Sequence, residues 1–374
     1  MKILKVGITG SSGFIGSHLV DRLRREEHIV IMPYEKGYFE DIEKLKDYVS
    51  KCDVVVHLAA MSRGEEKEIY EINLALVKTL TSCMEVAGVS PHVIFASSKQ
   101  SMLDNPYGRS KKDGCKILEE WALRNKASLS LLTIPNVYGD RCKPFYNSVV
   151  ATFCYQLTHR KNPTIKIDRE LELVYINELT ENIYQVVENP PRGVNNIRIS
   201  GTINVTVSKI LSILENFRDC FFKRKVIPTL DSPFLINLYN VFLSYLDYKY
   251  LCHSPEIHSD YRGELYEIIK LSQGGQVFFS ITKSGVVRGN HYHTRKLETL
   301  CVLQGEAVIR LRRIGSKEVI EYNISADQPR YVEIPIFHTH SIENVGSNEL
   351  YTLFWSNELF NPDDSDTYYE EVCL

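Results

Sequence analysis

The sequence predicts two domains of different class, a doubly wound parallel α/β sheet followed by an all-β domain of sandwich or jelly-roll type. At 374 residues the chain is too long for one ordinary hydrophobic core. Strands alternate with helical segments through its first half, whereas short β-rich runs separated by turns fill the sequence after about residue 250. We place the two domains at residues 1–246 and 250–374.

Apolar runs locate the elements of the first domain. Strands are predicted at 3–8, 29–32, 53–58 and 92–96, with helices at 14–25, 42–50 and 68–86. Strands separated by helices imply a parallel sheet covered on both faces, which binds ligands at the carboxyl ends of its strands. The β-rich runs of the second half lie at 267–270, 277–281, 300–303, 307–311, 319–324 and 351–355. Two prolines and several aromatic residues in 228–246 predict a packed helical connector.

Composition excludes several classes of protein. The hydrophobic content of 44% and the charged content of 24% are typical of a globular protein. A net charge of −3 argues against a nucleic-acid partner, and no run of about 18 apolar residues predicts a membrane span. Nine cysteines without a Cys-x-x-Cys pair indicate reduced thiols, so we expect a cytoplasmic protein.

Three glycines lie at a spacing of three between the first predicted strand and the first helix. Gly10 permits the sharp turn, Gly13 lets the backbone approach a pyrophosphate, and Gly16 lets the helix pack on the strand. The phosphates of a dinucleotide would then lie against the unpaired N–H groups of the helix N-terminus. A glycine triplet alone is weak evidence, but the strand–turn–helix context is the one this chemistry requires.

A tyrosine and a lysine four residues apart form the second pattern. Tyr107 and Lys111 would share one face of a helix, where the ammonium lowers the pKa of the phenol and makes it a usable acid–base group. Ser98 follows the fourth strand and could hydrogen-bond the same substrate oxygen. Without the glycine turn, an ordinary pair on a surface helix would be the better interpretation.

Together these residues resemble the extended short-chain dehydrogenase/reductases. The matching blocks are TGSSGFIG at 9–16, HLAA at 57–60, ASSK at 96–99, YGRSK at 107–111 and PNVYG at 135–139. The resemblance implies that Ser98, with Ser97 as the adjacent alternative, Tyr107 and Lys111 are catalytic. It also implies substrate contacts for Asn136 and Asn147. The implied cofactor-binding residues are Gly10, Ser12, Gly13, Phe14, Ile15, Gly16, Leu58, Ala59, Tyr107 and Lys111.

The sequence departs from that pattern at two points. The interval between Ser98 and Tyr107 is unusually short, and no acidic residue directly ends the second strand. An acid there would hold the ribose hydroxyls of NAD, whereas a cation would suit a 2′-phosphate. Glu35 therefore favours NAD and Lys36 favours NADP(H), and of the two we expect NADP(H).

The second half carries a metal-ligand pattern. His291 and His293 at i and i+2 on a strand would face the same way, and Glu298 on the next strand and the later His340 would complete a site for Zn, Fe, Ni or Mn. The spacing resembles the first cupin motif in full. The second motif matches only in part, because Phe337 replaces its usual glycine. Of these metals we expect zinc.

A reductase followed by a cupin resembles the CapF/WbjC family of capsule and O-antigen biosynthesis. The matching blocks are NPYGRSK at 105–111, CKPFYNSVVATFCY at 142–155, Asp260-x-Arg262-Gly263, GNHYH at 289–293 and FNPDDSDTYYEEV at 360–372. The resemblance implies that the cupin epimerises carbon 3 of a UDP-2-acetamido-2,6-dideoxy-4-hexulose. The reductase domain would then reduce the carbon-4 ketone with NADPH to UDP-2-acetamido-2,6-dideoxy-β-L-talose, on the route to N-acetyl-L-fucosamine.

Two other functions are compatible with the same residues. One is a nucleotide-sugar epimerase or dehydratase that keeps its nicotinamide cofactor bound. The other is a non-catalytic sugar-nucleotide sensor in which the cupin is a structural module. His338 shares a face with His340 if that strand is regular. It could be a fifth ligand, a base or a surface residue, and we interpret it as a surface residue. Because both domain types usually self-associate, we expect a homodimer.

Overall fold

The computed structural model describes residues 3–252 and 254–373. The chain forms two compact units, unit 1 with residues 1–215 and 232–246, and unit 2 with residues 216–231 and 247–374. The predicted connector forms a helix, α8 (Pro233–Ser244), which belongs to unit 1. Across the described part of the chain, every helix is too short or too polar to cross a bilayer.

Unit 1 is built on a six-stranded parallel sheet, as the sequence predicts. Its strands follow the order β2-β1-β3-β4-β5-β8. Their bounds are β1 Leu4–Thr9, β2 Ile29–Met32, β3 Val54–His57, β4 His92–Ser98, β5 Leu129–Ile134 and β8 Val194–Arg198. The chain passes to β2 on one side of β1 and to β3 on the other. Their carboxyl ends therefore form the switch point at which such sheets bind ligands.

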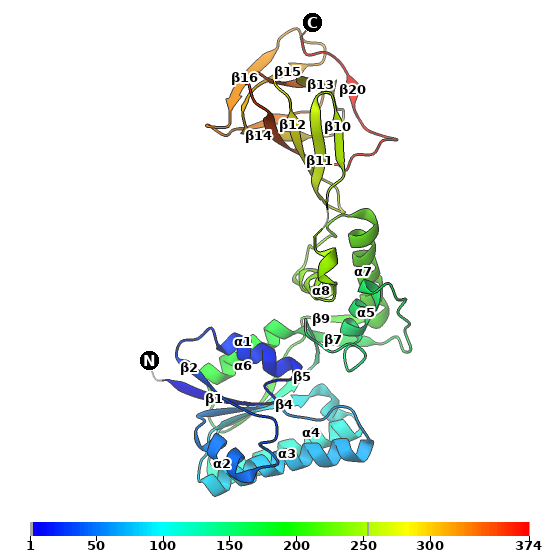
Figure 1. Ribbon diagram of the computed structural model, residues 1–374. Coiled ribbons are helices and arrows are strands. Elements are labelled where there is room, and N and C mark those ends of the chain that lie inside the picture. The colour runs from blue at the N-terminus through cyan, green and yellow to red at the C-terminus, as the bar shows by residue number, and fades with distance from the viewer. Residues whose placement is uncertain (1–2, 253, 374) are drawn as a thin grey trace. The chain divides into compact units, whose positions relative to one another are not determined.

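Helices cover both faces of this sheet (Figure 1). One face carries α1 (Phe14–Leu23) and α6 (Ile176–Glu188), and the other carries α2 (Ile42–Ser50), α3 (Glu66–Ala87) and α4 (Pro106–Asn125). Each face has its own apolar core, as expected for a doubly wound sheet. The remaining elements of the unit are β6 Asn136–Tyr138, α5 Val149–Thr158, β7 Glu170–Tyr175, β9 Ile203–Thr206 and the first part of α7 Val207–Asp219.

Local sequence explains where α4 begins, which matters because this helix carries Tyr107 and Lys111. Asn105 is its N-cap, and the Asn105 side chain accepts a hydrogen bond of 2.7 Å from the backbone N–H of Gly108. Pro106 takes the first helical position, where its missing N–H costs nothing. Tyr107 and Lys111 therefore lie in the first two turns of a well-capped helix.

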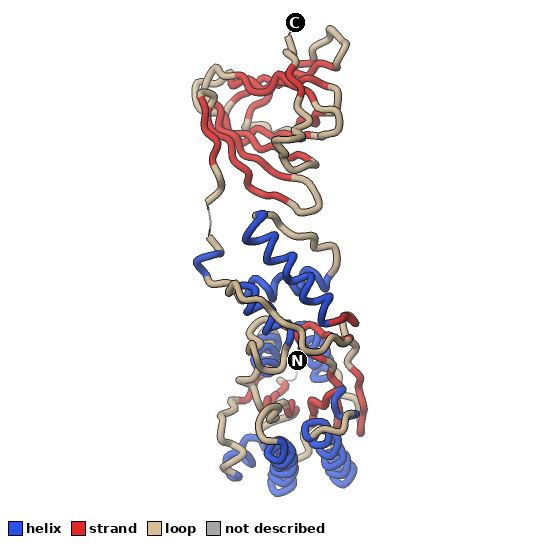
Figure 2. Tube along the Cα trace, turned by 90° about the vertical axis from the view of Figure 1, so that its right-hand side faces the viewer, coloured by secondary structure: helices blue, strands red, loops and turns tan. Residues whose placement is uncertain are grey.

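Unit 2 is an antiparallel two-sheet domain, which confirms the all-β prediction (Figure 2). One sheet has the order β10-β11-β12-β19-β14-β17 and the other β16-β15-β18-β13-β20. The bounds are β10 Ile257–Asp260, β11 Gly263–Lys270, β12 Gln276–Thr282, β13 Val287–Tyr292, β14 Glu298–Gln304, β15 Glu306–Arg313, β16 Ile320–Ser325, β17 Tyr331–Ile334, β18 His338–Asn344, β19 Leu350–Ser356 and β20 Tyr368–Tyr369. Aliphatic side chains form the core, among them Leu300, Val302, Ile309, Ile324 and Ile342.

Candidate functional site

The switch point of unit 1 is an organised crevice. Thr9, the last residue of β1, contacts the end of β3 through a 2.7 Å hydrogen bond between its Oγ1 and Nδ1 of His57. Burial lowers the pKa of His57 to about 3, with the nearby Lys111 adding to the effect, so this imidazole is neutral. The pair fixes the two strand ends side by side. Sequence reasoning assigned no role to Thr9 or His57.

The glycine turn has the geometry that its sequence predicts. Gly10 adopts φ +76°, and a Cβ there would lie 2.9 Å from the backbone nitrogen of Ala59. A Cβ on Gly16 would lie 2.2 Å from the carbonyl oxygen of Gly10, so only glycine lets α1 approach the turn this closely. Gly13 is the N-cap of α1 and brings no capping side chain, which leaves N–H groups of the first turn open to an anion.

The other predicted cofactor contacts lie around this turn. Ser12 and Gly13 are exposed, whereas Phe14 and Ile15 begin α1 and pack partly against the core below. Leu58 and Ala59 directly follow β3 at the same crevice. The structure therefore brings the glycine turn and the 58–59 segment together.

Lys111 is buried at the neighbouring strand end. It is 3% exposed, and its Nζ donates a 2.7 Å hydrogen bond to the carbonyl oxygen of Ala96 on β4. The ammonium also lies 4.6 Å from the ring centre of Phe95 and 5.7 Å from that of Tyr107. Burial lowers the pKa of Lys111 to about 8.

The predicted lowering of the Tyr107 pKa is wrong. Burial, with a smaller contribution from Tyr146, raises the pKa of Tyr107 to about 12. The Nζ of Lys111 lies over the Tyr107 ring, 5.7 Å from its centre, and donates to a backbone carbonyl, so its charge does not offset the burial of the phenol. The helical spacing correctly predicted that Tyr107 and Lys111 are neighbours. It did not predict the burial that controls the pKa of the Tyr107 hydroxyl.

The two candidate serines differ in environment. Ser98 ends β4, is partly exposed, and its Oγ accepts a 3.1 Å hydrogen bond from the N–H of Gln100. Ser97 is buried, and its Oγ lies 3.5 Å from the sulfur of Cys115. The short interval before Tyr107 is accommodated by Gly108, where a Cβ would lie 2.2 Å from the carbonyl oxygen of Gln100.

The two predicted substrate residues lie in different surroundings. Asn136 is exposed at the start of β6 and donates to the carbonyl oxygen of Glu172, 3.4 Å away. Asn147 is tied to the segment after β3, donating to Ser62 at 2.7 Å and accepting from Arg63 at 3.1 Å. Arg63 also binds the carbonyl oxygen of Phe145 at 2.7 Å. This connection joins the loop before α5 to the 58–63 segment, and sequence reasoning missed it.

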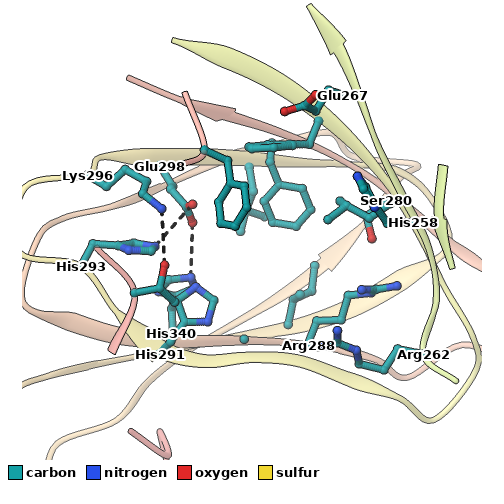
Figure 3. A pocket seen from close by; sticks show the side chains of 18 of the residues that line it. His258, Arg262, Glu267, Ser280, Arg288, His291, His293, Lys296, Glu298 and His340 are labelled. Atoms are coloured by element: carbon teal, nitrogen blue, oxygen red, sulfur yellow. Dashed lines mark hydrogen bonds and ion pairs between the residues drawn. The ribbon is translucent and has the colours of Figure 1, made fainter. Parts of the chain in front are cut away.

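In unit 2 the four predicted metal ligands converge. His291, His293, Glu298 and His340 each offer a ligand atom, and these atoms all lie within 4.8 Å of one another. Figure 3 shows the three imidazoles and the carboxylate turned toward a common point. Nε2 of His293 lies 3.4 Å from one oxygen of Glu298, and Nε2 of His340 lies 3.4 Å from the other. Three imidazoles and one carboxylate match the donors that Zn²⁺ and other transition metals prefer.

The hydrogen bonds of His293 favour a metal ligand over an ordinary core histidine. Its Nδ1 donates to the carbonyl oxygen of Asp366, which leaves Nε2 facing Glu298 as the ring atom available to a metal. That Nε2 is buried and has no hydrogen-bond partner among the described residues. Burial, with a smaller effect of His340, lowers the pKa of His291 to about 3, so this imidazole is neutral and able to bind a cation.

The carboxylate is held in its charged form. Burial alone would raise the pKa of Glu298, but contacts with His293 and His340 outweigh burial and hold this pKa below its ordinary value. His338, which we interpreted as a surface residue, lies outside the cluster, and its Nδ1 is 3.1 Å from the carbonyl oxygen of Ile336.

A β-bulge in β13 sets the direction of the first histidine. Between Gly289 and His291 the pairing with β18 shifts register, and Gly289 and Asn290 adopt φ of +102° and +57°. A Cβ on Gly289 would lie 2.5 Å from the carbonyl oxygen of His340, so glycine is required for this pairing. A regular strand therefore does not describe how His291 and His293 come to face the same point, because β13 is irregular before His291 and ends at Tyr292.

Asp366, which sequence reasoning missed, organises the loop between the histidines and Glu298. It is 3% exposed, and its carboxylate accepts from the N–H groups of Thr294, Arg295 and Lys296 at 3.1, 2.9 and 2.9 Å. The hydroxyl of Thr294 adds a fourth hydrogen bond of 2.6 Å. In the sequence, Asp366 is distinguished only as the last residue of the DDSD run at 363–366.

Comparison with known proteins agrees with the two-unit organisation. Residues 6–205 match the NAD dependent epimerase/dehydratase family, and residues 258–368 match the polysaccharide biosynthesis C-terminal domain. A UDP-2-acetamido-2,6-beta-L-arabino-hexul-4-ose reductase of Pseudomonas aeruginosa is 29% identical over 98% of both chains.

Solved structures extend the likeness to the whole fold. The capsular polysaccharide assembling protein CapF of Staphylococcus aureus is 33% identical, with 99% of this chain and 100% of that chain covered and a TM-score of 0.86. A UDP-N-acetylglucosamine 4-epimerase of Bacillus cereus covers 64% of this chain and 96% of its own at 18% identity and a TM-score of 0.53. This last match shows the fold alone.

Proposed function

The chain belongs to the CapF group of the NAD dependent epimerase/dehydratase family, and on this premise we propose that it is a bifunctional UDP-sugar enzyme. Unit 2 epimerises carbon 3 of a UDP-2-acetamido-2,6-dideoxy-4-hexulose. Unit 1 then reduces the carbon-4 ketone to give UDP-2-acetamido-2,6-dideoxy-β-L-talose for capsule or O-antigen synthesis. The observation that carries the proposal is the pair of partly buried Tyr107 and buried Lys111 at the carboxyl edge of the sheet.

The chemistry of unit 1 follows from the protonation state of Tyr107. Because the pKa of Tyr107 is raised to about 12, the phenol is protonated at neutral pH, which is the form that donates a proton to a ketone oxygen. NADPH, when bound, supplies the hydride for carbon 4. Tyr107 supplies the proton for the oxygen, and Ser98, at the end of β4, hydrogen-bonds that oxygen. The ketone becomes a hydroxyl, and the tyrosine regains its proton from solvent.

We propose NADP(H) as the cofactor, because β2 ends at Met32 without an acidic residue directly after it. The exposed Lys36 is available to a 2′-phosphate, although the exposed Glu35 beside it weakens the field of the lysine. The glycine turn would hold the pyrophosphate against the first turn of α1.

We propose that the four-residue cluster of unit 2 holds a divalent metal, with zinc the first candidate. The unpartnered Nε2 of buried His293 and the charged Glu298 fit a cation between them. When bound, the metal supplies Lewis-acid stabilisation of negative charge on the substrate oxygen. A ketone at carbon 4 acidifies the proton on carbon 3, so epimerisation through an enolate suits such a site.

The two-site assignment is tested with Tyr107→Phe. The variant is incubated with the UDP-4-keto sugar and NADPH in deuterated water, and products are assigned by NMR. We expect ketone reduction to fall by roughly 10²- to 10⁴-fold, because the proton donor is lost, while deuterium still enters at carbon 3. Tyr248→Phe, at a tyrosine 91% exposed, is the matched control and should retain both activities.

Three results would contradict the proposal. Loss of carbon-3 exchange in folded Tyr107→Phe would refute the separation of the two reactions. If the purified chain retained no metal, unit 2 would have only a structural role. Absence of steady NADPH consumption by the unmodified enzyme would instead favour an epimerase that keeps its cofactor bound.

A further inference from the structure

The cavity of unit 2 has two chemically different ends (Figure 3). It has a volume of about 430 Å³. The His/Glu cluster lies at one end, and Arg262 and Arg288 lie side by side at the other. Apolar side chains also line the cavity, among them Leu300, Phe278, Ile342 and Phe354. A ligand filling the cavity would therefore meet a cation site, an apolar stretch and a pair of guanidinium groups.

Arg288 is a cation that lacks a carboxylate partner. Its guanidinium donates to the Thr282 hydroxyl at 3.0 Å and to the carbonyl oxygens of Ile281 and Glu264 at 3.3 and 3.5 Å. Among the described residues no acid forms an ion pair with it. Burial, and next the charge of Arg262, lowers the pKa of Arg288, which means that the folded protein disfavours this charge. A half-buried cation held only by neutral acceptors is completed by an anionic ligand.

Arg262 differs because it already has a partner. It forms an ion pair of 2.6 Å with Asp260, two residues before it, and more than a third of its side chain is exposed. Asp260 therefore orients Arg262, and because it is already bound to Arg262 its charge offsets the charge of Arg288 only in part. The two guanidinium groups together can bind more than one oxygen of a diphosphate.

The bulge in β13 explains why Arg288 and His291 both line this cavity. Residues three apart on a regular strand point to opposite faces. The register shift between Gly289 and His291 changes that alternation and turns both side chains inward. The two positions are roughly 10 Å apart along the strand at 3.3 Å per residue, a separation that a hexose ring can bridge.

We propose that Arg288, assisted by Arg262, binds the diphosphate of the UDP-sugar in unit 2. The hexose ring then lies over the apolar stretch, with its carbon 3 toward His291, His293, Glu298 and His340. This inference rests on the proposed function, and it assigns unit 2 a subsite for the diphosphate of the substrate. That subsite is distinct from the glycine turn of unit 1, which would hold the pyrophosphate of the cofactor. It predicts that each chain binds UDP at two places.

The direct test is a calorimetric titration of the full, metal-loaded chain with UDP. We expect one site in each unit of the unmodified protein. In Arg288→Gln one of the two should weaken by about 10- to 100-fold, because charge-assisted contacts to a phosphate are lost. Arg313→Gln is the matched control, since Arg313 is exposed on β15 and does not line the cavity. Unchanged UDP binding by both sites in Arg288→Gln would overturn the inference.

A kinetic test separates this inference from the function on which it rests. Arg288→Gln should raise the KM for carbon-3 exchange of the UDP-sugar about 10- to 100-fold but leave exchange of the same keto sugar without its nucleotide unchanged. An unmodified enzyme with no carbon-3 exchange would refute the proposed function, while the UDP titration still decides the subsite. Equal KM values in variant and parent would refute the subsite alone.

A measurement on the unmodified chain guards against a variant that fails to fold. UDP should compete with the UDP-sugar for carbon-3 exchange, whereas uridine, which lacks the diphosphate, should not. Metal content is measured before and after to exclude chelation. Equal inhibition by uridine and UDP, or none by either, would contradict a diphosphate subsite in unit 2.

Discussion

Replacing Asp366 by asparagine separates the charge of this side chain from its shape. Asp366 has φ +45°, a left-handed conformation that asparagine tolerates better than most residues, so the backbone should be preserved. The amide removes the negative charge that four donors of the 294–296 segment share. The carbonyl oxygen that holds His293 remains in place.

The expected loss can be worked from these contacts. A hydrogen bond to a charged group contributes about 1.5–3 kcal/mol, against about 0.5–1.5 for a neutral one, so each contact weakens by about 1 kcal/mol. Because the four contacts share one carboxylate and are not additive, we expect about 3 kcal/mol in total. For a domain of this size that lowers Tm by about 10 °C.

The pH dependence supplies an independent check. Burial would raise the pKa of Asp366, but hydrogen bonds from Thr294, Arg295 and Lys296 outweigh it and hold this pKa below its ordinary value. The stabilisation is therefore fully present above the unfolded pKa of about 4 and is lost as pH falls below it. The difference in Tm between parent and Asp366→Asn should shrink as the pH is lowered through that range.

Thermal unfolding of unit 2 and a chelator competition for the metal are the assays. We expect metal affinity to fall by about 10- to 100-fold, because the loop that positions His293 and Glu298 is loosened. Asp363→Asn, at an exposed position in the same segment, should behave like the parent. A Tm within about 2 °C of the parent, together with unchanged metal affinity, would refute the assigned role of Asp366.

Three further substitutions test unit 1. Gly16→Ala should abolish NADPH binding in a fluorescence titration and lower Tm, because the new Cβ would lie 2.2 Å from the Gly10 carbonyl oxygen. Gly13→Ala, with its nearest contact at 3.2 Å, should cost less stability, and the reverse order would contradict this account. Lys111→Met should raise Tm of the cofactor-free protein at pH 7, because burial lowers the pKa of Lys111 to about 8 and disfavours its charge. That gain should shrink as pH rises from about 8 toward the unfolded value of about 10.4, and a gain that grows with pH would refute it.

Local patterns in the sequence predicted much of the fold. The run from β1 through the glycine turn to α1 was predictable because strand, turn and helix each have a local signal, and the turn needs glycine at Gly10 and Gly16. The convergence of the four candidate metal ligands was predictable because the motif spacing implies neighbouring strands. Of these, His340 comes from β18, a strand that the apolar runs did not reveal.

What the sequence could not reveal depends on contacts between distant segments. Asp366 is about 70 residues from the loop it organises, and nothing local distinguishes it from the exposed Asp363. The inward direction of Arg288 depends on a bulge, which reverses the alternation that a regular strand would predict. The pKa of Tyr107 depends on burial, which a helical spacing does not report.

The segment after β19 has a consequence for how damage would reach the His/Glu cluster of unit 2. Asp366 and β20, which pairs with β13 beside His291, lie in this segment, and buried Arg312 binds the carbonyl oxygen of Val372 at 2.9 Å. A proteolytic cut within residues 361–372 would therefore loosen the His/Glu cluster, although it removes none of its four residues.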